Sequence, residues 1–493
     1  MMKRRLLTFY SRTPMTDLSL LELDELRLAL AEGRITPIEA VDDFLVRCRS
    51  AQERLNCFVH LDEAAARERA LRLQREGSGR SRSSPSPSPS PLWGIPFAYK
   101  DIFATAGRSP AAGARLSCVP VARGESVVAD IEGQGAIALG ALSLDEISYG
   151  ATGLNAHYGH CRNPWNTDYI TGGSSSGAAA AVAAGAVPFA VCSDTAGSIR
   201  IPASLCGVTG FKPTYGSVRT DGTVPLSPSQ DTVGVIARAV RDCSRVMGIL
   251  QTHRGNAVEQ DGMLPRSPDI FQLGGKPLAG LRMAICRHPF FDMSWPDGEQ
   301  SIAAAFRVLE QLGARVFEQQ VDGMEDCDAA ATVITWTEVL ERYGSCLATE
   351  AERISGATRI RLETATAVTT ADYQRAVQHR PLAVRAFLRS AFANADLLVA
   401  PTITCATPRI DDLAGNPNES VKATTAFLRS NRCFSYLGLP ALSVPAGFSE
   451  HGLPIGLQII GRPWKDVDVL RCGAAYQDHT DWHRRRPILG PIC

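Results

Sequence analysis

The sequence predicts an α/β protein with a central mixed β-sheet that helices cover on both faces. Short apolar runs alternate with helical stretches, as in GIPFAYKD, ESVVADIEGQG and AIALGALS, and the alternation returns in residues 281–321. Alternating strands and helices are typical of such layered sheets. The chain also has no repeat of fixed period, which argues against solenoids and propellers.

Composition limits the functions that remain open. The 493 residues are 45% hydrophobic and 21% charged, as in ordinary soluble globular proteins. Acidic and basic residues number 51 each, so a net charge of zero gives no overall attraction to nucleic acids or anionic membranes. We therefore expect neither partner. The length would fit about three domains of ~150 residues or one large α/β unit, and we predict a single domain over residues 16–485.

The chain is expected to begin with helices. We predict that residues 1–15 form a disordered extension. They do not have the pattern of a signal peptide, because their apolar run is too short for its hydrophobic core. Ser19 and Glu22 have the spacing of a capping box before a first amphipathic helix. The residues TPIE at 36–39 begin a second helix in the same way, and residues 62–77 predict a third.

Four other features concern organisation. Residues 81–91, SRSSPSPSPSP, predict an exposed linker, because a Ser/Pro tract buries nothing. Residues 325–395 predict a mostly helical flank over the sheet, and residues 486–493 a C-terminal tail.

The longest apolar stretch, Ala178–Cys192, is shorter than the ~20 residues that cross a bilayer. Fourteen cysteines without a C-x-x-C pair are typical of reduced, mostly buried thiols, so we expect a cytoplasmic location.

The most informative segment is residues 170–216. Two small-residue loops, GGSSSG at 172–177 and DTAGS at 194–198, flank an Ala-rich helix and the short strand VPFAV. Glycine and serine are common in ordinary turns. These loops, however, adjoin apolar elements, and successive backbone N–H groups in such turns form a concavity that binds anions. The segment is therefore a candidate site.

Lysine usage gives a second, independent indication. The chain has only six lysines, and Lys100 ends the apolar strand GIPFAYK. A lone lysine usually extends to the surface. A lysine that is buried at a strand end has its pKa lowered by desolvation, which makes a neutral amine available as a base. Lys100 is therefore a candidate base.

These motifs resemble those of the amidase signature family. The lysine motif GIPxxxKD stands at Gly94–Asp101, the first serine motif GGSSxG at Gly172–Gly177, and the nucleophile motif at Asp194–Ser198, followed by IRIPA and CGVxGFKPTYG. The phrase RNPW precedes them at Arg162–Trp165. The resemblance covers roughly residues 15–480. It implies the amidase-signature α/β fold and hydrolysis of an amide C–N bond.

The resemblance implies a Ser-Ser-Lys triad. On the matching positions, Ser198 is the nucleophile, Ser174 is the serine that follows a cis peptide bond in the family, and Lys100 is the base. The chemistry of the residues agrees. A serine hydroxyl needs a base to remove its proton, and with no histidine near these motifs a neutral lysine acting through a second serine suffices.

The loop before the nucleophile supplies the expected oxyanion site. Backbone N–H groups of Thr195, Ala196, Gly197 and Ser198 would hold the oxygen of the tetrahedral intermediate. The family usually has two glycines before the nucleophile, and here the first is Ala196. If that residue must adopt a positive φ, alanine costs about 1 kcal/mol and reshapes the loop slightly.

Other site chemistries have weaker support. The segment GSSSG at 173–177 matches the nucleophile elbow G-x-S-x-G with Ser175 as nucleophile, but that motif needs an apolar strand before it, whereas CRNPWNTDYIT precedes it here. His157, His160 and Cys161 suggest a metal site, but no carboxylates follow at ligand spacing. No dinucleotide or P-loop motif is present. We therefore expect no metal and no cofactor.

The predicted function is hydrolysis of a carboxylic or urea-like amide through an acyl-enzyme on Ser198. The alternative is the glutamine-hydrolysing component of a tRNA-dependent amidotransferase, which shares the whole signature. SIRIPA at 198–203 argues against it, because that component is expected to have SIRQPA. A noncatalytic relative would need a lost triad residue, and all three are present.

The substrate is expected to be a small-molecule amide, and a homodimer is compatible with the sequence. In this family variable segments build the acyl pocket, here residues 110–160, 325–395 and 405–435. These segments carry no recognisable specificity pattern. Aryl, short aliphatic and urea-like amides all remain open.

Overall fold

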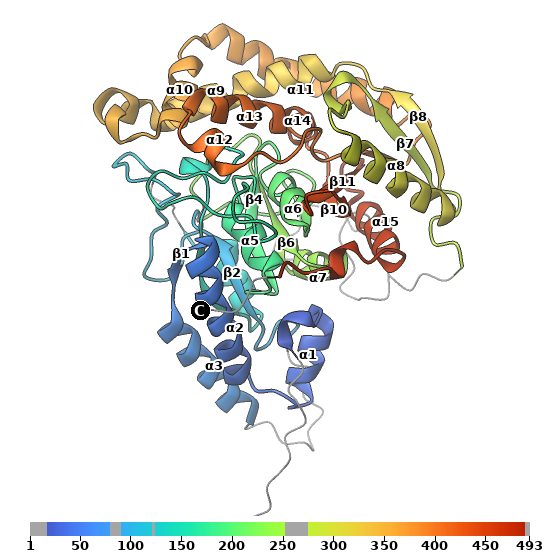
Figure 1. Ribbon diagram of the computed structural model, residues 1–493. Coiled ribbons are helices and arrows are strands. Elements are labelled where there is room, and N and C mark those ends of the chain that lie inside the picture. Colours follow the sequence, from blue (N-terminus) through green and yellow to red (C-terminus); the bar gives the residue numbers. More distant parts are fainter. Residues whose placement is uncertain (1–16, 79–89, 121–123, 252–274, 489–493) are drawn as a thin grey trace, which may run out of the picture.

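A mixed β-sheet of eleven strands forms the centre of the described chain (Figure 1). The structure is a computed structural model, which describes residues 17–78, 90–120, 124–251 and 275–488. The predicted extension at residues 1–15, most of the linker at 81–91 and most of the tail at 486–493 lie outside the described residues.

The sheet combines two parallel groups with antiparallel connections. Its strands are β1 (Phe58–Leu61), β2 (Pro96–Lys100), β3 (Ile137–Leu142), β4 (Phe189–Asp194), β5 (Thr209–Lys212), β6 (Thr232–Ala237), β7 (Arg282–Arg287), β8 (Arg315–Gln320), β9 (Leu397–Pro401), β10 (Ala441–Phe448) and β11 (Pro454–Gly461). Their order across the sheet is β1-β3-β2-β4-β6-β5-β10-β11-β9-β7-β8. Strand β2 is parallel to β3 and β4, and β7 is parallel to β8 and β9; the other pairs are antiparallel.

Helices cover the sheet. They are α1 (Leu23–Ala31), α2 (Pro37–Leu55), α3 (Glu63–Ser78), α4 (Val127–Gly133), α5 (Ser176–Ala183), α6 (Arg200–Cys206), α7 (Val240–Leu250), α8 (Pro296–Gln311), α9 (Met324–Thr349), α10 (Gly356–Ala365), α11 (Thr370–Ala391), α12 (Ile410–Ala414), α13 (Pro417–Arg429), α14 (Arg432–Tyr436) and α15 (Asp466–Asp478). Strands β2, β4, β6 and β11 are buried at every position. Successive side chains of a strand point to opposite faces, so both faces are covered. The predicted α/β class with a mixed sheet is confirmed.

The first helix begins three residues later than the sequence pattern predicts. A short 3-10 helix, Leu18–Leu20, comes first, and the side chain of Asp17 caps it by accepting the Ser19 N–H. The capping box of α1 consists of Glu22 and Glu25 instead, and Glu25 accepts the Glu22 N–H at 2.9 Å. The predicted box of Ser19 and Glu22 is therefore wrong, because Asp17 already uses the Ser19 N–H.

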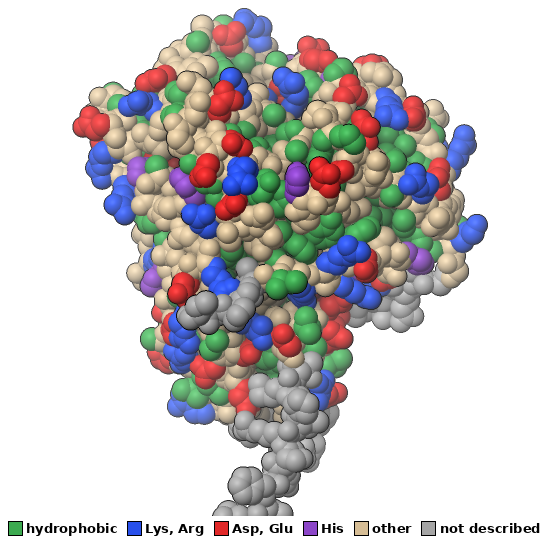
Figure 2. All heavy atoms as spheres, viewed as in Figure 1, with side chains coloured by type: hydrophobic (Ala, Val, Ile, Leu, Met, Phe, Trp, Pro, Cys, Tyr) green, Lys and Arg blue, Asp and Glu red, His purple; other side chains and the backbone are tan. Residues whose placement is uncertain are grey.

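The second helix begins as predicted. In α2 the Thr36 hydroxyl accepts the Glu39 N–H at 3.3 Å, and the Glu39 carboxylate accepts the Thr36 N–H at 2.9 Å. This reciprocal pair satisfies two backbone donors that have no partner within the helix. None of the described helices is both long and apolar enough to cross a membrane. On the visible face of the molecule, acidic and basic side chains are interspersed (Figure 2).

Two cysteines depart from the expectation of reduced thiols. Cys118 and Cys346 form a disulfide, which joins a loop to α9 across 228 positions of sequence. Their Cα atoms are 5.9 Å apart, because the loop that carries Cys118 packs against this helix. The other described cysteines are buried, except for the partly buried Cys405. A partner so distant in sequence leaves no local pattern that predicts the bond.

A fully buried ion pair joins four elements at the centre of the protein. Asp194, at the end of β4, accepts two hydrogen bonds from the guanidinium of Arg200, at 2.9 and 3.0 Å. Arg200 also donates to Gln458 on β11 at 2.7 Å, and to the Asn431 carbonyl and the Ser435 hydroxyl at α14. Burial raises the pKa of Asp194, but the Arg200 charge outweighs it and holds the pKa at about 2. The carboxylate therefore stays ionised throughout the neutral range.

We predict that Arg200→Met destabilises the protein strongly. Removing one partner of a buried pair leaves an uncompensated charge, which typically costs about 3–5 kcal/mol. Adding Asp194→Asn should restore part of the loss, because the unpaired carboxylate is then gone. The free energy of unfolding in urea measures both effects. The exposed pair of Arg287 and Glu318 gives the control, because Arg287→Met should cost less than about 1 kcal/mol. A loss of that small size in Arg200→Met would contradict the role of the buried pair.

Candidate active site

Sheet topology brings the lysine and serine motifs together. Strands β2 and β4 are parallel neighbours, with Tyr99 opposite Val191, so their carboxyl ends lie at the same edge of the sheet. Lys100 is the last residue of β2, and the loop that begins at Asp194 follows β4. Helix α5 starts at Ser176, directly after the first serine loop, and packs against β2 and β4. One sheet edge therefore carries both loops and the lysine.

Lys100 is fully buried and faces two hydroxyl groups. Its Nζ lies 2.7 Å from Ser174 Oγ and 3.2 Å from Ser193 Oγ, and it donates to both. Burial lowers the pKa of Lys100 to about 8, although nearby negative groups, among them Asp145, partly oppose the shift. Because the lowered pKa lies near neutrality, a substantial fraction of the amine is uncharged at mildly alkaline pH.

The first serine loop packs tightly against a buried carboxylate. The peptide bond between Gly173 and Ser174 is cis. A Cβ on Gly173 would lie 1.9 Å from Asp145 Oδ1, so no side chain fits at this position. Asp145 is fixed in turn by the N–H groups of Thr152 and Gly153, at 3.1 and 3.0 Å. This packing sets the position of the backbone that carries Ser174.

The second serine loop wraps around Asp194. The Asp194 carboxylate accepts the N–H of Gly197 at 2.7 Å and that of Ile199 at 3.1 Å. The Ser198 carbonyl accepts the Ser175 N–H at 3.1 Å, which joins the two serine loops. Ser198 itself is 5% exposed and lines a cavity together with Ala196.

The predicted set of oxyanion donors needs one correction. The Gly197 N–H is taken by Asp194, so it does not face an approaching substrate. The N–H groups of Ala196 and Ser198 form no hydrogen bond with any other described residue. Gly197 has a φ of 127°, whereas Ala196 is absent from the positive-φ residues of the described chain. Ala196 therefore has no backbone strain from a positive φ. The position in this loop whose positive φ favours glycine is 197, and it is a glycine.

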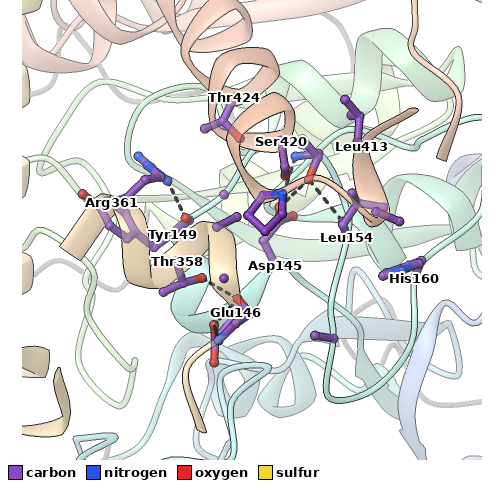
Figure 3. Close-up of a pocket in the computed structure, with 18 residues that line it drawn as sticks. Asp145, Glu146, Tyr149, Leu154, His160, Thr358, Arg361, Leu413, Ser420 and Thr424 are labelled. Atoms are coloured by element: carbon purple, nitrogen blue, oxygen red, sulfur yellow. Dashed lines mark hydrogen bonds between the residues drawn. The ribbon is translucent and has the colours of Figure 1, made fainter. Parts of the chain in front are cut away.

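Ser198 lines one cavity, and a second, larger cavity adjoins it. The smaller one is lined by Ser198, Leu226, Trp336 and Arg361, among others. The larger one, shown in Figure 3, shares Tyr149 and Arg361 with it, so these two side chains lie between the cavities.

The walls of the larger cavity come from three parts of the chain. Figure 3 shows Asp145 and Glu146 from one segment, Thr358 from a second, and Leu413 and Thr424 from a third. The segments expected to form the acyl pocket, residues 110–160, 325–395 and 405–435, supply all of its lining.

The competing candidate residues lie elsewhere. Ser175 is buried at the start of α5, and its hydroxyl donates to the Ser193 carbonyl at 3.4 Å. No strand precedes it directly, as a nucleophile elbow requires. The His157 ring lies 2.6 Å from the Glu146 carboxylate. Among the described residues no group of three or more His, Cys, Asp or Glu side chains could hold a metal ion.

Sequence reasoning missed several residues of the site. Ser193 and Asp145 contact Lys100 or the loop of Ser174, and Asp231 accepts a hydrogen bond from the Thr195 hydroxyl at 2.5 Å. None of them stands in a short motif of its own. Arg361 is a further example, because it reaches the cavity from a helix more than 160 positions after the nucleophile loop.

Known proteins share the sequence and the fold of this chain. Residues 39–470 match the amidase family. The chain is 35% identical to the A component of the glutamyl-tRNA(Gln) amidotransferase of Roseiflexus castenholzii, over 96% of this chain and 98% of that protein. Among solved structures, a chain from a vestigial protein complex, described as revealing the evolutionary origins of an s-triazine catabolic enzyme, is 30% identical, with a TM-score of 0.82 over 93% of this chain and 98% of that one. A structure described as an amidase is 29% identical, with a TM-score of 0.80 over 93% and 100%.

The family match covers most of the chain, and the relatives align along nearly its full length. The motifs that carry the resemblance lie at one sheet edge. The chain therefore belongs to the amidase family, whose members act on C–N amide bonds.

Proposed function

We propose that the protein hydrolyses a small-molecule carboxylic or urea-like amide through an acyl-enzyme on Ser198. The observation that supports this most directly is the contact between a fully buried lysine amine and Ser174 Oγ, at 2.7 Å. A buried lysine with a pKa of about 8 can supply an uncharged amine as a base. The loop of Ser198 is joined to the same serine loop by a backbone hydrogen bond.

The proposed reaction has two halves. In the first, neutral Lys100 takes the proton of Ser174 as Ser174 takes that of Ser198, and Ser198 Oγ attacks the amide carbonyl. The backbone N–H groups of Ala196 and Ser198 hold the oxyanion, with that of Thr195 beside them. Ser174 then donates a proton to the departing amine. In the second half, water attacks the acyl-enzyme by the same proton path and releases the acid.

A second candidate is the glutamine-hydrolysing component of a glutamyl-tRNA(Gln) amidotransferase. It is favoured by the identity of 35% to the A component of such an enzyme over nearly the whole chain. This similarity favours the amidotransferase component more strongly than the segment SIRIPA favours a free amidase. The chemistry at Ser198 would be the same. The two candidates differ in the amide that they need, because the amidotransferase component would use glutamine, which carries an ammonium and a carboxylate beside its side-chain amide.

The proposed nucleophile is tested by trapping the acyl-enzyme. We expect a slowly deacylating ester substrate to leave its acyl group on Ser198, located by mass spectrometry of peptides. Ser198→Ala should form no adduct and lose at least ~1,000-fold in kcat, because the nucleophile is gone. Ser175→Ala is the matched control and should still form the adduct. An adduct on Ser175 or on a cysteine would refute the assignment.

The pH dependence follows from the pKa of Lys100. The amine is protonated below about pH 8 and neutral above it, so its basic form increases as pH rises. We expect kcat/KM to rise about tenfold between pH 7 and pH 9 and then to level off. Lys100→Arg should show no such rise, because a guanidinium does not lose its proton in this range. A flat wild-type profile would contradict a lysine base.

Matched ester and amide substrates test the proton path. An amide's amine must gain a proton to leave, whereas a phenoxide leaves with less help. Lys100→Ala should therefore lower the rate of amide hydrolysis ~1,000-fold or more. The fold-loss in ester hydrolysis should be at least ~10 times smaller than the fold-loss in amide hydrolysis. The measurement is kcat/KM for an anilide and a phenyl ester of the same acid. Equal losses would mean that Lys100 does not return the proton through Ser174.

A further inference from the structure

We propose that the acyl group of the substrate carries a carboxylate that Arg361 binds, and that the same pocket rejects an ammonium group. This inference rests on the proposed function, because it takes Ser198 as the nucleophile. It goes further by naming a substrate class, the monoamides of dicarboxylic acids and related anionic amides.

Arg361 is held at the wall that divides the two cavities. It lies on α10, and its guanidinium carbon is 3.7 Å from the centre of the Tyr149 ring. One of its N–H groups donates to the Tyr149 carbonyl, as Figure 3 shows. Stacking on an aromatic face fixes the plane of a guanidinium, and the fork of remaining donors suits a carboxylate. Arg361 also lines the cavity of Ser198.

The start of α10 is fixed to the loop that carries Tyr149. The Glu146 carboxylate accepts the N–H of Ser355 at 3.0 Å, and Ser355 precedes α10 directly. Helix α10 also packs against α9 and α13. Arg361 is therefore positioned before any ligand arrives, which reduces the entropy that binding costs.

Arg361 forms no ion pair with a described residue, although it is only partly exposed. The neighbouring Arg432 pairs with Asp328 at 2.7 Å. Asp145, the acidic group that acts on Arg361 across the pocket, is beyond ion-pair distance and accepts hydrogen bonds from Thr152 and Gly153. Taking a charge out of water without a partner is unfavourable. A bound carboxylate would supply that partner.

The described lining of the Ser198 cavity offers no acidic side chain to an ammonium group. Its described lining holds two arginines and no aspartate or glutamate. The remaining walls are mostly apolar and aromatic, with Leu226, Trp336 and Leu428 among them. A cation there would meet the guanidinium of Arg361, which has no ion-pair partner among the described residues, and no acidic side chain in the described lining, so like charges would oppose it. The pocket therefore suits an acid with an apolar chain, and not an amino acid.

Matched substrates test the proposal. Succinamate, glutaramate and adipamate are compared with butyramide, pentanamide and hexanamide, which carry a methyl group where each acid has its carboxylate. We expect kcat/KM to favour at least one acid by about 10- to 100-fold over its neutral counterpart, the usual contribution of hydrogen bonds to a charged group. Arg361→Met should abolish this ratio, and Arg361→Lys should keep part of it. Glutamine, which adds an ammonium to glutaramate, should react at least ~10-fold more slowly than glutaramate.

Arg359 gives the matched control. It lies on the same helix, is exposed and faces Glu363 at 3.8 Å. Arg359→Met should keep the ratio of acid to neutral amide. A wild-type enzyme that prefers the neutral amides, or that uses glutamine as well as glutaramate, would overturn the proposal while leaving amide hydrolysis intact.

Binding measured without turnover distinguishes carboxylate binding by Arg361 from amide hydrolysis at Ser198. In the Ser198→Ala protein, calorimetry should show tighter binding of the preferred acid than of its neutral counterpart, and adding Arg361→Met should remove the difference. Equal binding of the two in Ser198→Ala would overturn the role of Arg361 whatever the enzyme hydrolyses. Tight, Arg361-dependent binding without any amide hydrolysis by the wild type would support the anion site and refute the proposed function.

Discussion

The buried pair of Asp194 and Arg200 is the constraint on which the rest of the site depends. Asp194 does two things at once, because its oxygens accept both the guanidinium and the N–H groups of Gly197 and Ile199. The loop around Ser198 is therefore wound around an anion. That anion stays ionised in a buried place because Arg200 lies beside it, and Arg200 is anchored in turn by β11 and α14. The packing of β11 and α14 against the start of α6 thus completes the nucleophile loop.

A comparison of two buried lysines shows what distinguishes Lys100. Lys212 is also fully buried, and burial lowers its pKa to about 7. Its Nζ, however, donates to the Pro213 carbonyl at 3.0 Å, an oxygen that cannot pass on a proton. Lys100 faces the hydroxyl groups of Ser174 and Ser193. A lowered pKa is therefore common to both side chains, and the neighbouring hydroxyls give only Lys100 a path for proton transfer.

The sequence predicted the parts of the protein that local pattern determines. The alternation of strands and helices, the capping box of Thr36 and the loops of Ser174 and Ser198 depend on neighbours in the chain, and the structure has them where they were expected. The predicted capping box of Ser19 and Glu22 was wrong even though it is a local pattern, because the Asp17 side chain accepts the Ser19 N–H instead.

What could not be predicted depends on partners distant in sequence. Cys118 bonds to Cys346, and Arg200 reaches Gln458. Arg361 lines a cavity whose other wall carries Ser198. Each of these contacts is decided by the packing of whole elements and leaves no spacing to detect. The Gly197 N–H is a case of the same kind, because only the folded loop shows that Asp194 takes it.

The division of labour between the sheet edge and the helical flank has an evolutionary consequence. The lysine and the two serines belong to β2, to the turn before α5 and to the loop after β4, whereas Trp336 and Arg361 belong to α9 and α10. Substitutions on those helices can change which acid is accepted without disturbing the ion pair that shapes the nucleophile loop. Chemistry and selectivity can therefore diverge at different rates within one ancestral scaffold. Such a scaffold can acquire a new substrate by exchanging a few side chains of these two helices, while the catalytic lysine and serines stay unchanged.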